Sequence, residues 1–249
     1  KDIYLARAKW MNESTLTYQT QSRDQQILNL NAININNGKQ KILLQESSNT
    51  WLNLNFDLHF LSDNKHFVWA SERDGFKHVY LYRNNGELVR QITKGDWVVE
   101  RINAIDETKG LIYFQGRKDT PLESHVYSVA LDGSDITRLS KADQFHSATF
   151  SSDASVYVDS HSTANTPAQV SLHGADGSMI TWLDENKVDQ NHPLYNFTDD
   201  WVKPEFGSIK AQDGSDLQYR LYKPKELRGK HPVIVYLYGG PHVQMVTNS

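Results

Sequence analysis

The sequence contains no cysteine and no long apolar run. Without thiols the chain can form no disulfide, no zinc–thiolate site and no cysteine nucleophile. A membrane-spanning helix needs about 18 or more consecutive apolar residues, and no stretch approaches that length, so we predict no membrane span. These two absences exclude disulfide-stapled and helical membrane proteins as classes.

An excess of one charge is also missing. Lysine and arginine number 26 against 30 aspartates and glutamates, which gives a net charge of −4, and the basic residues form no block. We therefore expect no nucleic-acid partner. The composition, 38% hydrophobic and 11% aromatic, is that of a folded globular protein. The ten histidines are scattered, and we found none at ligand spacing with a carboxylate, so we predict no metal site and no cofactor.

Neither end of the sequence has the features that we expect of a natural terminus. The chain starts at Lys1 without a methionine and stops at Ser249, soon after a strongly apolar run over residues 233–238. We therefore expect the chain to be a segment of a longer protein.

Four turn motifs recur along the first 180 residues. Each joins Asn or Asp to Gly, the pair that supplies positive φ in a tight hairpin turn. They are Asn37-Gly38, Asn85-Gly86, Asp132-Gly133 and Asp176-Gly177. Successive glycines are 48, 47 and 44 residues apart. Short strands repeating with a period in the forties are typical of a β-propeller, in which each repeat is one four-stranded blade.

Strand-like runs flank every one of these turns. Two runs precede each turn and one follows it, at residues 16–20, 27–30 and 40–44; 67–71, 78–82 and 88–93; 111–115, 125–129 and 136–139; and 156–160, 169–172 and 179–183. Helical periodicity is almost absent before residue 190. The sequence therefore predicts a mainly β fold, with about four consecutive four-stranded blades over residues 1–190.

Four blades lie at the low end of the usual range of about 4–8 for a closed propeller. An open half-ring leaves strand edges and a blade face uncovered, which invites pairing. We therefore predict that these blades are part of a larger propeller. For the chain alone we predict a homo-oligomer formed by self-association through the open propeller edges.

The character of the sequence changes after residue 190. Residues 191–195 read as a connector, and strand-like runs on either side of Asp213-Gly214 predict another hairpin. Residues 233–238 then form a continuous apolar run without alternation, which predicts a strand buried on both faces, as in the core sheet of an α/β protein. We accordingly place a domain boundary between residues 1–190 and 191–249.

Several motifs resemble one family of peptidases. The run Tyr238-Gly239-Gly240-Pro241-His242, the residues 202–207 and 213–224 before it, and the propeller segment 71–81 are similar to bacterial dipeptidyl peptidase IV. That family belongs to the prolyl oligopeptidase clan of serine peptidases. The resemblance extends over the whole chain.

The resemblance implies both an architecture and an activity. It implies an eight-bladed propeller joined to an α/β-hydrolase domain that releases Xaa-Pro or Xaa-Ala dipeptides from peptides with free N-termini. The chain would then hold the last four blades and, in residues 191–249, a connector and the N-terminal strands of a truncated hydrolase domain. The family also suggests a periplasmic or secreted bacterial enzyme.

Tyr238 is the candidate catalytic residue that the resemblance supplies. In the family the tyrosine before Gly-Gly-Pro donates to the oxyanion hole. A phenol hydroxyl at the end of a sheet strand is suited to that role, because it is a neutral donor that can point at a developing oxyanion. The alternative is a tyrosine that ends a buried strand with its hydroxyl in water.

The remaining catalytic groups are absent from this sequence. It contains no Gly-Xaa-Ser-Xaa-Gly elbow, and in an α/β-hydrolase the acid and the histidine follow that nucleophile along the chain. We therefore predict no nucleophile, acid or catalytic histidine here, and a chain inactive alone. The adjacent glutamates that bind the substrate's amino terminus in this family are also absent. We interpret His242 as a loop residue that lines a cavity.

Phe56 is a second candidate, for substrate binding. It lies in the segment after Trp51, which borders the outer substrate pocket in this family. Phe56 would stack on a substrate side chain, although a core or inter-blade aromatic is an equally good interpretation.

Two further functions stay open at this point. The chain could belong to a non-catalytic propeller that serves as a binding module. It could also belong to a sister peptidase of the same clan, an oligopeptidase or an acylaminoacyl peptidase, in which the paired glutamates would be missing altogether.

Overall fold

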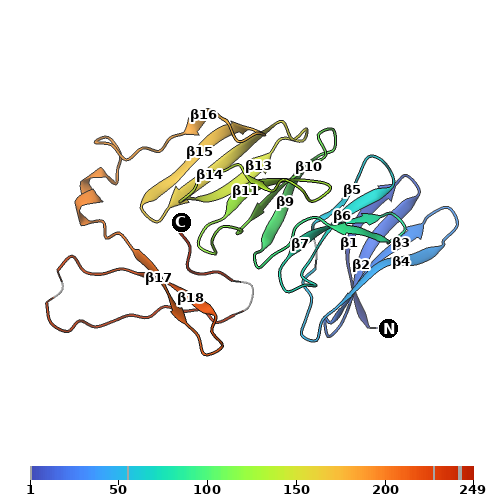
Figure 1. Cartoon of the computed structure of the whole chain (residues 1–249), viewed down its shortest axis with the longest axis horizontal. Helices are drawn as coiled ribbons and strands as arrows, with labels where there is room; N and C mark the ends of the chain where they lie inside the picture. The colour runs from blue at the N-terminus through green and yellow to red at the C-terminus, as the bar shows by residue number, and fades with distance from the viewer. Residues whose placement is uncertain (1, 55, 227, 241–242) are drawn as a thin grey trace. The chain divides into compact units, whose positions relative to one another are not determined.

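The computed structural model describes residues 2–54, 56–226, 228–240 and 243–249, and it is built almost entirely from β-strands (Figure 1). The first sheet holds β1 (Ile3–Asn12), β2 (Thr15–Ser22), β3 (Ile27–Asn34) and β4 (Gln40–Ser47). The second holds β5 (Leu58–Phe60), β6 (His66–Ser71), β7 (His78–Arg83) and β8 (Leu88–Gln91). The third holds β9 (Val99–Asp106), β10 (Leu111–Gly116), β11 (His125–Ala130) and β12 (Thr137–Arg138). The fourth holds β13 (Phe145–Phe150), β14 (Val156–Thr163), β15 (Thr166–Gly174) and β16 (Met179–Asp184).

Each sheet has the strand order of a propeller blade. The four strands follow one another in sequence order, which is the meander expected of a blade. The prediction of four consecutive four-stranded blades is therefore confirmed. In every sheet the three strands around the Asn/Asp-Gly turn were predicted, whereas the first strand (β1, β5, β9 or β13) was not.

The turn glycines meet two separate demands. Gly86, Gly133 and Gly177 all have φ between 87° and 96°, a conformation that other residues rarely adopt. A Cβ atom would also have too little room at each of them. At Gly177 it would lie 2.8 Å from the carbonyl oxygen of Leu139, and at Gly86 it would overlap the backbone of Leu43. The turn of one sheet thus packs directly on the preceding sheet, at its last strand or at the residue just after that strand.

The second sheet contains two deeply buried strands, β6 and β7. Phe67 and Trp69 of β6 are fully buried, and they face Tyr82 and Tyr80 of β7 across the sheet. The rings of Phe67 and Tyr82 stack with their centroids 5.2 Å apart. This aromatic layer packs on Leu28, Leu30, Leu43 and other apolar residues of the first sheet. The core of this region therefore forms between neighbouring blades.

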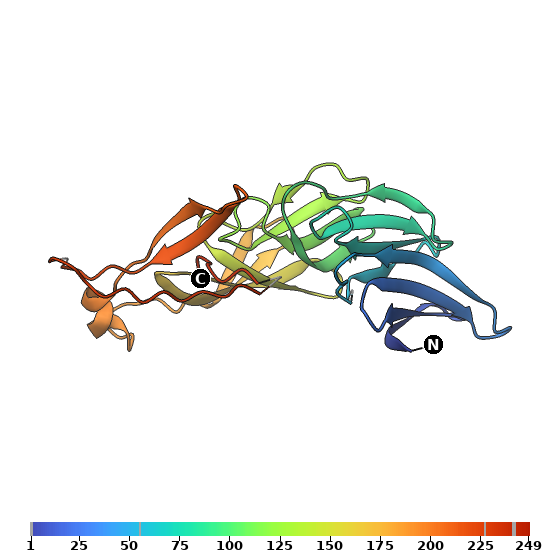
Figure 2. The same ribbon diagram turned by 90° about the horizontal axis from the view of Figure 1, so that it is seen from below.

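The chain divides into two compact units. One comprises Lys1–Phe114 with Ser128–Thr137, and the other comprises Gln115–Tyr127 with Arg138–Ser249. The boundary runs through the third sheet. The second unit also contains a short 3₁₀-helix (Tyr195–Asp200) and the hairpin of β17 (Glu205–Lys210) and β18 (Asp216–Leu221), which forms a sheet of its own (Figure 2).

The predicted hairpin around Gly214 is present, but the strand predicted over residues 233–238 is not. Within the described residues no strand follows β18, so the structure contains no strand of an α/β-hydrolase sheet. The side chains that were expected to be buried on both faces are exposed, from 58% at Tyr238 to 96% at Ile234. An apolar run forms a core strand only where other strands pair with its backbone and cover its faces, and no described residue does so here.

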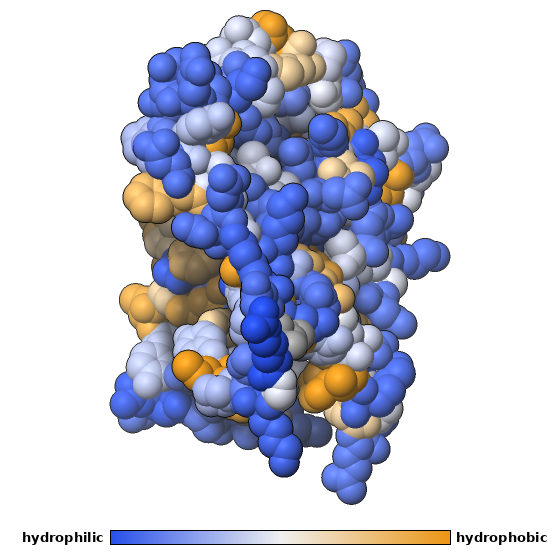
Figure 3. Space-filling view, turned by 90° about the vertical axis from the view of Figure 1, so that its left-hand side faces the viewer, coloured by the Kyte–Doolittle hydropathy of each residue, from blue (hydrophilic) through white to orange (hydrophobic). Residues whose placement is uncertain are grey.

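Exposed apolar side chains occur elsewhere in this part of the second unit. Figure 3 looks at the molecule from the side that carries the 3₁₀-helix and the β17–β18 hairpin, and hydrophobic residues are visible there among hydrophilic ones. Phe197 of the helix and Ile209 of β17 are each about 60% exposed. Among the described residues, no helix has the length and apolar character needed to cross a membrane.

Candidate functional site

Tyr238 lies in the extended segment after β18 and does not form part of a sheet. The residue is 58% exposed, so it is not a core aromatic. The ring folds back over the backbone of Gly240, where a Cβ atom would lie 2.5 Å from the tyrosine oxygen. Glycine at position 240 thus allows this side-chain position. Pro241 and His242, including the proposed cavity role of His242, lie outside the described residues.

The segment that follows is held by Asn248. Its backbone N–H donates to the carbonyl oxygen of Leu122 over 2.8 Å, and its side-chain oxygen accepts from the N–H of Ala164 over 3.2 Å. Its amide nitrogen donates to Glu123 Oε1 and to the carbonyl oxygen of Asp143, both over 3.2 Å. Asn248 therefore joins the end of the chain to three loops of the same unit, about ten residues after Tyr238. No local sequence signal pointed to this residue.

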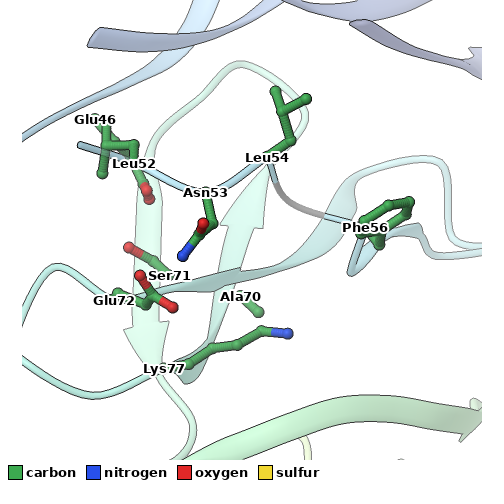
Figure 4. Close-up of a pocket in the computed structure, with 9 residues that line it drawn as sticks. All are labelled: Glu46, Leu52, Asn53, Leu54, Phe56, Ala70, Ser71, Glu72 and Lys77. Atoms are coloured by element: carbon green, nitrogen blue, oxygen red, sulfur yellow. The ribbon is translucent and has the colours of Figure 1, made fainter. Parts of the chain in front are cut away.

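A pocket in the first unit contains the second candidate, Phe56. The side chains that line the pocket come from the end of β4, the segment that leads to β5, and the end of β6 with the turn after it (Figure 4). They are Glu46, Leu52, Asn53, Leu54, Phe56, Ala70, Ser71, Glu72 and Lys77. The lining mixes apolar side chains with two carboxylates and one ammonium group.

Phe56 projects from the rim of this pocket. Its side chain is 74% exposed, so it is not a core aromatic. The guanidinium carbon of Arg7 lies 3.5 Å from the centre of the phenyl ring, a cation–π contact that covers one face of the ring. An exposed ring that is fixed in this way is available for stacking on its other face.

Two charged side chains of the pocket, Glu46 and Lys77, are paired with other residues of the same unit. Glu46 accepts from the Trp69 indole N–H over 2.9 Å and from Arg73 over 2.7 Å. Lys77 donates to Asp57 over 2.5 Å and to the backbone oxygen of Glu100 over 2.9 Å. These contacts bridge separate strands, so they hold the walls of the pocket in position.

A group of buried ionisable residues lies in the fourth sheet and includes neither candidate. His146 of β13 faces His161 of β14 directly across the strand pair, and Asp159 lies two residues before His161 on the same face. Asp159 Oδ2 is 2.7 Å from His146 Nδ1 and 3.3 Å from His161 Nδ1. Burial acts to raise the pKa of Asp159, but the two imidazoles outweigh burial and hold this pKa at about 2. All three side chains are 8% exposed or less.

His125 of β11 extends this group on the other side of His146. The two imidazole rings lie with their centroids 5.4 Å apart. His125 Nε2 is 2.9 Å from Glu123 Oε2, and Nδ1 is 2.9 Å from the hydroxyl of Ser140. Burial lowers the pKa of His125, and the carboxylate of Glu123 opposes that effect.

The sequence analysis missed this group. The spacing Asp-Xaa-His places two ligand-type side chains on one face of a strand, and that signal was present. The position of His146 opposite His161 was not visible, because the register of β13 against β14 is a property of the fold and β13 itself was not predicted.

Comparison with known proteins places these features in context. Residues 1–168 match the family described as the dipeptidyl peptidase IV (DPP IV) N-terminal region. Human dipeptidyl peptidase 8 is 29% identical over 247 residues, covering 83% of this chain and 27% of the human protein. Dipeptidyl peptidase 4 of Trichophyton equinum is 25% identical over 260 residues, covering all of this chain and 33% of the fungal protein.

Two solved structures of dipeptidyl peptidases are also similar to this chain. The crystal structure of Porphyromonas gingivalis dipeptidyl peptidase 4 superposes with a TM-score of 0.87 at 27% identity, over 99% of this chain and 35% of that one. A putative dipeptidyl aminopeptidase IV from Bacteroides ovatus gives a TM-score of 0.83 at 28% identity, over 100% of this chain and 38% of that one. The chain thus spans about a third of the length of these relatives. On the match over residues 1–168, it belongs to the dipeptidyl peptidase IV N-terminal region family.

Proposed function

We propose that this chain supplies propeller blades and the oxyanion-hole tyrosine of a serine exopeptidase that releases Xaa-Pro and Xaa-Ala dipeptides. The observation that carries the proposal is similarity along the whole chain: the match to Porphyromonas gingivalis dipeptidyl peptidase 4 covers 99% of it and so includes the segment around Tyr238. The substrates would be peptides with a free amino terminus and proline or alanine in second position.

Tyr238 would act at the step in which negative charge develops on the scissile carbonyl oxygen. When a serine Oγ attacks the carbonyl carbon, the oxygen becomes an oxyanion, and a phenol O–H about 2.7–3.1 Å away stabilises it. Tyr238 is 58% exposed and lies outside the described strands, so its side chain is not part of the core. The serine, its histidine and its acid would come from sequence other than these 249 residues, which contain no nucleophile elbow.

We expect Tyr238→Phe to lower kcat of the full-length peptidase about 100- to 1,000-fold with little change in KM, because the lost hydrogen bond forms chiefly in the transition state. Steady-state hydrolysis of Gly-Pro and Ala-Pro chromogenic substrates measures this effect. The matched control is Tyr236→Phe, two residues away and 83% exposed. Equal activity of the Tyr238→Phe and wild-type enzymes would refute the assigned role.

The chain alone is expected to hydrolyse neither substrate. Turnover that copurifies with the 249-residue chain and disappears in Tyr238→Phe would contradict the proposal that the catalytic groups lie elsewhere. A full-length protein that also fails to hydrolyse these substrates would favour the alternative, a propeller that binds peptides without cleaving them.

For Phe56 we propose a contact with a substrate side chain at the rim of the pocket. Phe56→Ala in the full-length peptidase should raise KM for peptides with a bulky aromatic residue by about 3- to 10-fold and leave kcat near the wild-type value, because an exposed aromatic contact contributes roughly 0.5–1.5 kcal/mol. Phe76→Ala is the control, since Phe76 is also exposed but does not line the pocket. Unchanged KM values for Phe56→Ala would exclude this contact.

A further inference from the structure

The buried group in the fourth sheet has the residue types and the arrangement of a metal-binding site. His146 and His161 are direct partners across the antiparallel pair β13–β14, and Asp159 stands beside them on the same face. The candidate ligand atoms of these three residues all lie within 4.8 Å of one another. Two imidazoles and one carboxylate are a common ligand set for zinc and related transition metals.

Hydrogen bonds within the protein do not satisfy all the polar atoms of this group. His146 Nε2 lies 2.8 Å from the carbonyl oxygen of Lys141, which only accepts, so this nitrogen carries a proton. His146 Nδ1 faces the Asp159 carboxylate, which also only accepts when ionised. Both ring nitrogens of His146 therefore face oxygens that accept hydrogen bonds and do not donate them.

Two buried polar atoms of the group make no hydrogen bond with the described residues. One is Asp159 Oδ1, and the other is His161 Nδ1, which lies 3.3 Å from Asp159 Oδ2 without the alignment of a hydrogen bond. An unsatisfied buried polar group costs about 1–3 kcal/mol, so native structures rarely keep two of them side by side. A cation bound to neutral His146, neutral His161 and ionised Asp159 would satisfy both atoms at once.

We propose that His146 Nδ1, His161 Nδ1 and the Asp159 carboxylate form a binding site for a divalent transition metal, with zinc as the ion that fits best. Zinc accepts imidazole nitrogen at about 2.0–2.1 Å and carboxylate oxygen at about 2.0–2.2 Å in tetrahedral geometry. Three protein ligands leave one position for a water molecule. Calcium and magnesium are disfavoured because both prefer ligand sets made of oxygen alone.

The surroundings of the site match those of known metal ligands. A metal-bound histidine usually donates its second ring N–H to a backbone carbonyl or a carboxylate, which fixes the ring and the tautomer. His146 makes this bond to Lys141. Because the site is buried, the ion would cross-link β13 and β14, and its role would be structural. This inference is independent of the proposed peptidase activity.

The first experiment measures stoichiometric binding. The 249-residue chain is stripped with a chelator, dialysed, and titrated with Zn²⁺ by calorimetry, and the bound metal is then counted by elemental analysis. We expect one tightly bound zinc ion per chain. His161→Gln should weaken binding at this site about 100-fold or more, because loss of an outer partner of a ligand already costs 10- to 100-fold.

A matched control comes from the second sheet. His66 Nδ1 lies 2.6 Å from Asp63 Oδ2, which is the same kind of histidine–aspartate pair in a partly exposed position and outside the three-residue group. His66→Gln should therefore leave zinc binding unchanged. Zinc binding that is equal in wild type and His161→Gln, or that is lost only in His66→Gln, would overturn the proposal.

The second experiment locates the ion and does not depend on the folding of a variant. Anomalous diffraction at the zinc edge from crystals grown with equimolar zinc should place the ion in contact with His146, Asp159 and His161. A metal found only at other residues, or a water molecule hydrogen-bonded to Asp159 Oδ1 and His161 Nδ1 in the presence of zinc, would contradict the assignment.

Discussion

Two apolar stretches of this chain have opposite fates. Residues 66–71, His-Phe-Val-Trp-Ala-Ser, form β6, in which five of six side chains are buried. Residues 233–238, Val-Ile-Val-Tyr-Leu-Tyr, are more apolar, yet they form no strand and their side chains are 58–96% exposed. Hydrophobic composition alone therefore does not decide which stretch becomes a core strand.

The difference lies in the neighbours that each stretch finds. β6 pairs with β5 on one side and β7 on the other, so its backbone groups are satisfied and its aromatic side chains are covered. Residues 233–238 pair with no strand among the described residues. Contacts within and between repeats thus stabilise the blades, whereas residues 233–238 find no pairing strand in the described part of the chain.

The largest expected effect is on the free energy of unfolding, when one aromatic side chain in each of the two stretches is truncated. Trp69→Ala should reduce the free energy of unfolding by about 3–5 kcal/mol, because it empties a fully buried site and leaves Glu46 without its indole donor. Tyr236→Ala should change it by no more than about 0.5 kcal/mol, because that side chain is 83% exposed. Denaturant unfolding monitored by circular dichroism measures both values. Similar losses for the two variants would mean that residues 233–238 are packed as tightly as β6.

A smaller difference in the free energy of unfolding is expected between alanine substitutions at two turn glycines that have nearly the same backbone φ angle. Gly86 and Gly214 have φ of 96° and 88°, so alanine is strained at both, at about 1–2 kcal/mol each. At Gly86 the added Cβ atom also overlaps Leu43, whereas at Gly214 nothing lies within 4 Å. Gly86→Ala should therefore cost about 1–3 kcal/mol more than Gly214→Ala in the same unfolding measurement. Equal costs would show that the turn of one blade does not pack on the blade before it.

Local chemistry made most of the blade fold predictable. The Asn/Asp-Gly turns fix a positive-φ position in each repeat, and the strands beside them are rich in β-branched and aromatic residues, so three strands per sheet could be located. The first strand of each sheet could not be. β5 has only three residues, and β9, Val-Glu-Arg-Ile-Asn-Ala-Ile-Asp, mixes charged with apolar positions too evenly to stand out.

Residues 233–238 were predicted as a buried strand because the apolar run itself does not show whether other strands are available to pair with it. Asn248 and the pair of His146 with His161 join residues that are far apart in the sequence or lie on separate strands, so only the folded structure brings them together. The role of Tyr238 came from resemblance to a family, and it remains a proposal.

Amide hydrogen exchange followed by mass spectrometry tests the central claim most directly, namely that neighbouring strands distinguish the blades from the Tyr238 segment. The 249-residue chain should show strong protection for peptides covering residues 66–71 and 78–83, and exchange close to that of an unfolded chain for a peptide covering residues 233–238. Slow exchange of residues 233–238, comparable with that of β6, would contradict the claim, because it would require hydrogen-bonded partners that none of the described residues provides.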